Sequence, residues 1–149
     1  MADLSLRLDA FIPYLLSVTS NVVSDAVAST YQALFGLTIP EWRLIAVIAE
    51  DEGITQQQVG RRTRMDKVTV SRATIALVDR GLVERKPHAT DRRSQSLHLT
   101  RAGHVLYDQV APKAIELEQR IFASFDPQEL AAFRHMLARI QSVTLALDT

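Results

Sequence analysis

The sequence predicts a mainly α-helical fold with a small β-hairpin, built from six helices in a single domain over residues 1–149. Three features support this prediction: helix-start signals recur along the chain, two short alternating segments flank a polar turn, and an apolar stripe with helical spacing lies near the C-terminus. The length of 149 residues and the apolar fraction of 47% suit one domain with a buried core.

The first helix is expected from about residue 9 to about residue 34. Its apolar side chains cover more than one face, a pattern typical of a terminal helix that packs against something besides its own domain. Gly36 suits the turn that follows. The sequence TIPE at residues 38–41 forms a capping box with a first-turn proline, which predicts a second helix over residues 41–50.

Two shorter helices should follow in close succession. The sequence TQQQ at residues 55–58 repeats the capping pattern and predicts a short helix over residues 55–62. After a polar turn, Asp66 can cap a further helix over residues 66–80. Gly81 stands where a left-handed C-terminal cap is needed.

The next segments predict a β-hairpin with a charged tip. Residues 82–86 and 96–100 partly alternate between apolar and polar side chains, as strands do when one face is buried. The residues between them, 87–95, are polar and turn-forming.

Two helices complete the predicted fold. A long helix is expected over residues 100–122, with Thr100 as its cap and a bend near Val110 caused by Pro112. Asp126 and the proline after it should start the last helix. Its apolar stripe suits a helix–helix seam, although it could also be plain core; the stripe consists of Leu130, Phe133, Leu137, Ile140, Thr144 and Leu147.

Positive charge is concentrated in residues 61–101. This segment holds eleven Lys/Arg and four Asp/Glu, a net of +7, while the rest of the chain carries −7 and the whole chain is neutral. A segment this basic within a folded domain suggests an anionic partner, and a polyanion such as nucleic acid is the obvious one. The alternative is a solvated basic face.

Several classes of function lack the residues they need. The chain has no cysteine, which excludes disulfides, thiolate metal sites and thiol-based redox sensing. Its histidines do not show the spacing of a helical metal site; they are His88, His98, His104 and His135. No glycine-framed nucleophile or phosphate-binding loop is present. We therefore expect no metal, no cofactor and no enzymatic activity.

Neither a signal peptide nor a membrane span is predicted. The first residues lack a basic region followed by an apolar core, and no apolar run approaches the ~18–20 residues that a span needs. We expect a soluble, cytoplasmic protein with no membrane partner.

Helix, short helix, turn, helix and hairpin, in that order, form the arrangement of a winged helix-turn-helix, whose second helix enters the DNA major groove. That helix begins here with hydroxyl, methyl and cationic side chains that can contact base edges and phosphates. The arginines beside the turn suit phosphates, and those at the hairpin tip suit the narrow minor groove. The candidate DNA-contacting residues are Thr55, Gln56, Arg61, Arg62, Arg64, Lys67, Val68, Thr69, Ser71, Arg72, Arg92 and Arg93.

Simpler interpretations are open for some of these residues. The arginines around the turn could be a solvated basic face. Thr69 and Ser71 could be ordinary polar positions on a helix surface. Asp91 and Arg93 could form an ion pair with each other, which would also hold the arginine outward.

The run from Leu37 to Gly103 resembles the MarR family of bacterial transcriptional regulators. The matching motifs occur in the order and spacing of the family: WRL at residues 42–44, TQQQVG at 55–60, DKVTVSR at 66–72, GLVER at 81–85, DRRS at 91–94 and LHLTRAG at 97–103. One departure is Lys67-Val68, where many members carry Pro-Ser or Ser-Ser, so the operator sequence does not carry over. The absent cysteine excludes the peroxide-sensing thiol branch.

The resemblance implies an obligate homodimer that binds a pseudo-palindromic double-stranded DNA operator, usually as a repressor. It implies dimerisation helices at residues 1–36 and 104–149 and a DNA-binding module at residues 37–103. Asp91 would brace the wing, and Arg93 would enter the minor groove. The dimer interface would include Leu8, Phe11, Leu130, Phe133, Leu137, Ile140 and Leu147.

The resemblance also implies release from DNA by a small ligand, bound between the first, second and long helices. The aromatic residues near those helices favour an aromatic acid or its acyl thioester, which Arg43 could neutralise. Each aromatic residue could equally belong to the core, and Arg43 could be structural. The candidate ligand-binding residues are Phe11, Tyr14 and Trp42, followed by Tyr31, Arg43 and Tyr107.

Two other functions stay open at this point. One is a DNA-binding regulator without a small-molecule ligand, an activator included, that is controlled by a partner protein or by its own abundance. The other is an enzyme that shares the fold, although the sequence lacks a nucleophile–base set.

Overall fold

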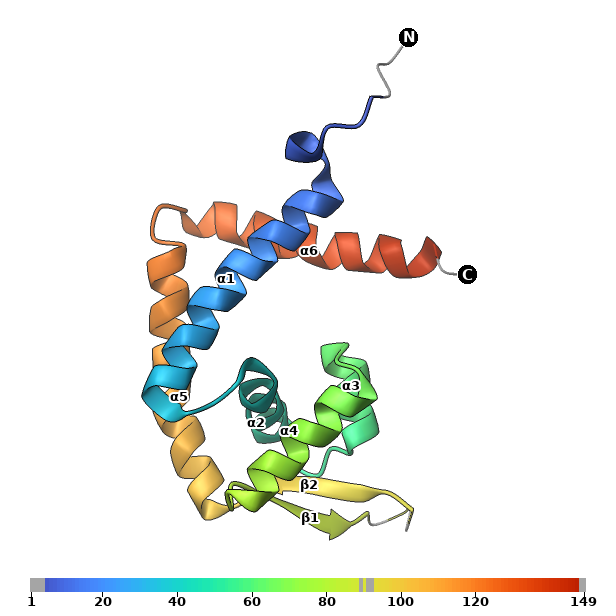
Figure 1. Ribbon diagram of the computed structural model, residues 1–149, viewed down its shortest axis with the longest axis vertical. Helices are drawn as coiled ribbons and strands as arrows, with labels where there is room; N and C mark the ends of the chain where they lie inside the picture. Colours follow the sequence, from blue (N-terminus) through green and yellow to red (C-terminus); the bar gives the residue numbers. More distant parts are fainter. Residues whose placement is uncertain (1–4, 89, 91–92, 148–149) are drawn as a thin grey trace. The chain divides into compact units, whose positions relative to one another are not determined.

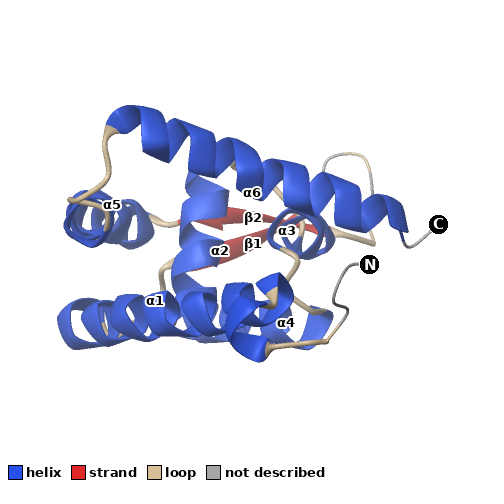
Figure 2. Cartoon of the chain, turned by 90° about the horizontal axis from the view of Figure 1, so that it is seen from above, coloured by secondary structure: helices blue, strands red, loops and turns tan. Residues whose placement is uncertain are grey.

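The computed structural model describes residues 5–88, 90 and 93–147. It contains two compact units, Met1–Pro112 and Lys113–Thr149. The expected fold class is confirmed, because six α-helices and one antiparallel hairpin make up most of the regular structure of the described residues (Figure 2). The elements are a 3-10 turn η1 (Leu8–Ala10), α1 (Ile12–Phe35), α2 (Ile39–Glu50), α3 (Gln56–Thr63), α4 (Lys67–Asp79), β1 (Val83–Pro87), β2 (Gln95–Leu99), α5 (Arg101–Ile121) and α6 (Pro127–Leu147) (Figure 1).

Side-chain caps start the helices where the sequence predicts them. Thr38 and Thr55 each form a capping box, in which the hydroxyl accepts a hydrogen bond from the backbone N–H three residues on and the side chain there accepts one in return. Asp126 and Glu129 make the same reciprocal bonds at the start of α6. Each box satisfies backbone donors that an uncapped first turn leaves without partners.

Helix α1 begins at Ile12 rather than near residue 9, and Pro13 is the reason. A helix running through Asp9 would need an N–H on Pro13, and the proline ring would collide with the Asp9 carbonyl. The chain instead forms η1 and an extended residue, Phe11, so that Pro13 falls in the first turn of α1. At the other end, Gly36 closes the helix in the left-handed conformation with a φ of 62°.

The core of the larger unit lies among α2, α3, α4 and the hairpin. Helix α2 packs against α4 and β2, and α3 packs against α4. Burying an aliphatic side chain of this size contributes roughly 1.5–3 kcal/mol, so this core fixes the relative positions of these elements. Its fully buried side chains include Leu44, Ile45, Ile48, Val59, Val70, Leu77, Val83 and Leu97.

A third extended segment, which the sequence did not predict, joins the hairpin. Both strands lie one residue nearer the hairpin tip than predicted, and Arg85 is paired with Leu97. On the other edge of β2, the Leu97 N–H donates to the Ile54 carbonyl and the Gly53 N–H donates to the Leu97 carbonyl, both at 2.9 Å. The residues directly before α3 are therefore hydrogen-bonded to the wing.

Helix α5 begins against the base of the hairpin. The Thr100 hydroxyl accepts a hydrogen bond from the Gly103 N–H at 3.1 Å. A Cβ on Gly103 would lie 2.1 Å from the carbonyl oxygen of Leu82, so only glycine fits there. The helix continues without a break through Pro112, and the boundary between the two units follows that proline. The bend expected near Val110 stays a prediction.

Within the described ranges, no single helix is long and apolar enough to cross a membrane. Helices α1 and α2 reach that length and composition only when taken together, and a bend of 78° separates them.

Candidate nucleic-acid interface

Asp66 fixes the start of α4, the predicted recognition helix. Its carboxylate accepts a hydrogen bond from the Thr69 backbone N–H at 2.7 Å. This bond is the largest cause of the lowered pKa of Asp66, and the positive charge of Arg72 lowers that pKa further. The carboxylate is therefore ionised at neutral pH and stabilises the first turn of α4.

The turn between α3 and α4 is short and closely packed. Arg64 ends α3 in the left-handed conformation with a φ of 60°, which no other non-glycine residue in the described part of the chain adopts. The Thr63 hydroxyl donates to the Val59 carbonyl at 2.7 Å and accepts from the Met65 N–H at 3.3 Å. A Cβ on Gly60 would lie 3.4 Å from the Met65 carbonyl oxygen. These contacts set the angle between the two helices.

The predicted DNA-contacting residues around this turn differ in exposure. Thr69 and Ser71 are half-buried, so only part of each side chain can reach a ligand. Val68 is 57% exposed, which leaves its methyl groups available to a thymine methyl. The exposed cations around the same turn are Arg61, Arg62, Arg64, Lys67 and Arg72.

Two depressions lie beside the start of α3, and we call them together the α3–wing groove. The first has a volume of about 490 Å³ and is lined by α3 together with Lys67 and Val70 of α4. The second, of about 320 Å³, lies between the start of α3 and the hairpin. Gln56 and Gln57 line both, so the two depressions adjoin. Four predicted contacts line this groove: Thr55, Gln56, Lys67 and Arg93.

The wing contributes one cation that sequence analysis did not single out. Arg85 lines the α3–wing groove together with Arg93, and both are exposed. The alternation of β1 was the signal that could have found Arg85, because it places this residue on the same face as the buried Val83. Asp91 and Arg92, expected at the wing tip, lie outside the described residues.

Two arginines of the +7 segment are held by other parts of the fold. Arg62 forms an ion pair with Glu50 of α2. Arg80 donates hydrogen bonds to the carbonyls of Gly36 and Phe35, at 3.1 and 3.4 Å, and so closes the end of α1. A contact between Arg62 and a phosphate stays a prediction.

The candidate ligand-binding aromatics do not form one cluster within the chain. Trp42 contacts Tyr31 edge-on at 5.6 Å between ring centroids and stacks on Tyr107 at 5.9 Å. Burial raises the pKa of Tyr31, which therefore stays neutral. Phe11 and Tyr14 are exposed, and the 17-residue step along α1 from Tyr14 to Tyr31 is about 25 Å. The expected trio of Phe11, Tyr14 and Trp42 is therefore not brought together in one chain.

Arg43, the candidate partner of an anionic ligand, is exposed on α2. Among the described residues, no group of three or more His, Asp or Glu side chains is placed to hold a metal ion.

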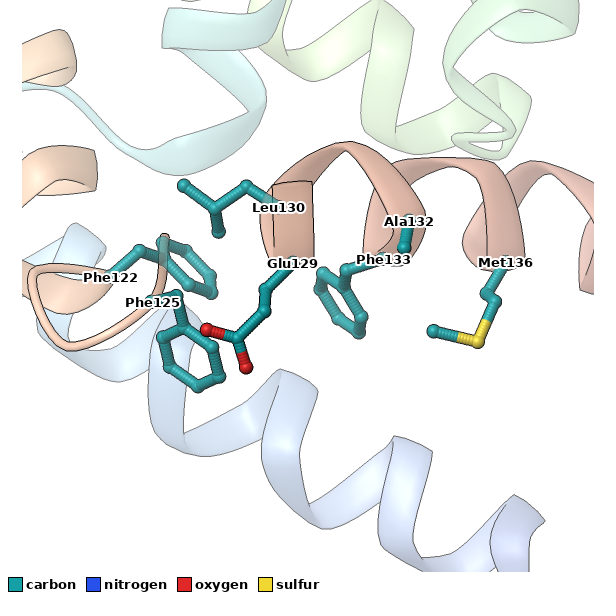
Figure 3. A pocket seen from close by; sticks show the side chains of 7 residues that line it. All are labelled: Phe122, Phe125, Glu129, Leu130, Ala132, Phe133 and Met136. Atoms are coloured by element: carbon teal, nitrogen blue, oxygen red, sulfur yellow. The ribbon is translucent and has the colours of Figure 1, made fainter. Parts of the chain in front are cut away.

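The unit Lys113–Thr149 exposes an apolar groove of about 310 Å³ (Figure 3). The ring of Phe122 lies 5.9 Å from that of Phe125 and 6.3 Å from that of Phe133, and Leu130 and Met136 extend the lining along α6. No residue of α6 is buried. Of the predicted interface residues, Leu130 and Leu137 are half-buried in the single chain, and the others are exposed: Leu8, Phe11, Phe133, Ile140 and Leu147.

Comparison with known sequences finds related regulators. Residues 35–94 match the family model described as MarR family. Over 134 residues the chain is 24% identical to the HTH-type transcriptional repressor Rv2887 of Mycobacterium tuberculosis, which covers 90% of this chain and 96% of that protein.

Comparison with solved structures finds the same fold. A MarR/EmrR family transcriptional regulator from Acinetobacter sp. ADP1 superimposes with a TM-score of 0.86 at 24% identity, covering 93% of this chain and 98% of that one. The PcaV transcriptional regulator from Streptomyces coelicolor, in complex with its natural ligand, gives a TM-score of 0.79 at 20% identity, covering 97% and 99%.

Proposed function

The chain belongs to the MarR family of transcriptional regulators, and from this premise we propose that it represses transcription as a homodimer bound to a pseudo-palindromic DNA operator. The regulators compared above are not enzymes. The observation that carries the proposal is the α3–wing groove, whose two adjoining depressions are lined by the first turns of two helices and by two wing arginines.

In this proposal the first turn of α4 enters the major groove. Lys67, Val68 and Arg72 are exposed there and offer cationic and apolar groups to base edges and phosphates. Arg93 enters the adjacent minor groove, which favours arginine where it is narrow. Two copies must present their α4 helices about 34 Å apart to reach successive major grooves.

The proposed dimer follows from the apolar surface that a single chain leaves uncovered. Side chains of α1 and α6 such as Ile12, Val22, Met136 and Leu147 are between 50% and 78% exposed. Exposed apolar side chains gathered on one helix, as each of these two helices has them, mark an interaction site. A second copy of the chain is the occupant we propose, because the operator is expected to have two half-sites.

DNA selection followed by binding titration tests the proposed function. The unaltered protein should select a duplex with two-fold related half-sites from a randomised pool, and its affinity should fall steeply with salt because it contacts phosphates. Arg93→Ala should weaken binding to that duplex with the fold and the dimer intact, as checked by circular dichroism and sedimentation. Unchanged affinity would contradict the minor-groove role of Arg93.

We further propose that a small aromatic acid or its acyl thioester releases the protein from DNA. PcaV, whose fold is the same, was solved with its natural ligand, which supports a small effector here. The ligand would bind best to a conformer whose α4 helices are misplaced for the operator, and a coupling of ~1–3 kcal/mol would change DNA affinity about 5–150-fold. The test is a thermal-shift screen of such acids, followed by DNA release with each stabilising compound.

The packing of Trp42 against Tyr31 and Tyr107 favours a second candidate function. Aromatic rings that fill the space against one another suit a structural cluster rather than a ligand pocket. A regulator of this kind would have no small-molecule ligand and would respond to a partner protein or to its own abundance. A screen in which no stabilising compound releases DNA would favour this candidate.

A further inference from the structure

Arg85 occupies an unusual position for a charged side chain. In the antiparallel register it is paired with Leu97, which is completely buried, and it shares its face of β1 with the buried Val83. That face of the hairpin is turned toward the core, whereas the next residue, Lys86, points to the opposite face. Arg85 nevertheless remains exposed, because it lies where the core ends and the α3–wing groove begins.

Within the described part of the chain, Arg85 has no acidic partner, unlike two other cations of the same +7 segment. Lys86 lies 3.4 Å from a carboxylate oxygen of Glu84, and Arg62 pairs with Glu50. The cation of Arg85 instead borders a depression whose other lining residues, apart from Leu97, are polar or positive, including Thr55, Gln57 and Arg93. The depression thus has two arginines, Arg85 and Arg93, on the core-facing side of the hairpin.

The start of α3 adds donors to this depression. In its capping box the Thr55 hydroxyl accepts a hydrogen bond from the Gln58 N–H, and the Gln58 side-chain oxygen accepts one from the Thr55 N–H. The N–H groups of Gln56 and Gln57 precede the first bonds within the helix and form no hydrogen bond in the described structure. Gln56 and Gln57 line the same depression as Arg85, so an anion there would meet both a guanidinium and a helix N-terminus.

We propose that Arg85 and the first turn of α3 bind one backbone phosphate of the DNA, between the major-groove helix and the wing. The proposal rests on the proposed function, and it assigns Arg85 a role different from that of Arg93. A phosphate contact carries no sequence information, so Arg85 fixes the depth and register of the wing rather than its base preference. It anchors β1 to the backbone that separates the two grooves.

Two neighbouring cations on opposite faces of one strand allow a matched test. The affinity of the unaltered protein, Arg85→Gln and Lys86→Gln is measured at several salt concentrations, on the duplex that the unaltered protein selects from a randomised pool. Arg85→Gln should bind more weakly, and the slope of log K against log salt should become shallower by about 0.9 for each subunit. Lys86→Gln should keep the slope of the unaltered protein.

The discrimination between A·T and G·C pairs under the wing provides a second readout. It should be unchanged in Arg85→Gln, since only a phosphate contact is removed. An unchanged salt slope in Arg85→Gln, an equal change in Lys86→Gln or an altered base preference would each overturn the proposal while leaving the proposed function standing. If the unaltered protein selects no duplex, both fail.

Discussion

At the scale of single residues, Asp66 links the stability of the recognition helix to pH. The hydrogen bond from the Thr69 N–H holds the pKa of Asp66 below its ordinary value of 3.8. Because the folded-state pKa is lowered, the ionised cap contributes stability above the ordinary value, and this contribution is lost as the pH falls through the folded-state pKa.

We therefore expect the stability of Asp66→Asn to depend less on pH in the acidic range than that of the unaltered protein. Asparagine still accepts a hydrogen bond from the Thr69 N–H but does not titrate. Between about pH 5 and about pH 2 the melting temperature of the unaltered protein should fall more steeply than that of the variant. Melting curves that stay parallel over this range would contradict the role given to the Asp66 carboxylate.

The difference between Asp66 and Arg80 shows which residue roles could be predicted from the sequence. The acceptor of a cap lies three residues from its donor, so local sequence was enough to place Asp66. Arg80 donates to carbonyls 44 and 45 residues away, and Arg62 pairs across 12 residues with Glu50. Only the packing of α1, α2, α3 and α4 decides those partners, and no local pattern encodes it.

At the scale of elements, Glu52 connects three parts of the larger unit. It lies between α2 and α3, and its carboxylate contacts His98 of β2 at 3.3 Å and His104 of α5 at 3.1 Å. It also accepts a hydrogen bond from the Leu99 N–H at 3.3 Å. Glu52 is more than a third exposed, so solvent screens its contacts with the two histidines and the backbone hydrogen bond is the larger contribution.

Glu52→Ala should loosen the last residues of β2 without unfolding the protein. Losing the acceptor of the Leu99 N–H should lower the free energy of unfolding by about 1 kcal/mol and speed hydrogen exchange at that amide. The exposed ion pair of Glu84 with Lys86 lies on the same hairpin, so Glu84→Ala is the matched control and should leave both measurements nearly unchanged. Equal effects of the two substitutions would contradict a specific role for Glu52.

How well the boundaries of helices and strands could be predicted depended on how far along the chain their causes lie. The capping residues of α2 and α3, Thr38 and Thr55, were predicted correctly, although α2 begins two residues before the predicted residue 41; α1 begins late because Pro13 acts on a carbonyl four residues earlier. The pairing of Gly53 and Ile54 with β2 could not be predicted, since those residues are too few to show alternation and their partner is over 40 residues away. The α3–wing groove depends on that pairing, so its shape required the structure even though four of its residues were predicted.

At the scale of the whole molecule, the net positive charge and the exposed apolar stripe of α6 lie in different segments of the chain. Residues 61–101 carry the net +7, and the rest of the chain carries −7. The unit Lys113–Thr149 has little core of its own: no residue of α6 is buried, and Phe133, Met136, Ile140, Val143 and Leu147 are each at least 40% exposed. Their spacings of 3, 4, 3 and 4 form one stripe, as a seam between helices requires.

Ile140→Glu should therefore convert the proposed dimer into monomers, because a carboxylate in an apolar seam loses its hydration without gaining a partner. Ala138→Glu is the control: it adds the same charge to α6 about 200° around the helix from Ile140, where it stays in water. Sedimentation equilibrium should give half the mass for Ile140→Glu and an unchanged mass for Ala138→Glu.

Since the two half-sites would no longer be bound by linked subunits, the DNA affinity of Ile140→Glu should fall by about 100-fold or more. A monomer that keeps full affinity would show that the groove and wing of one chain suffice, and a dimer that survives Ile140→Glu would place the interface elsewhere.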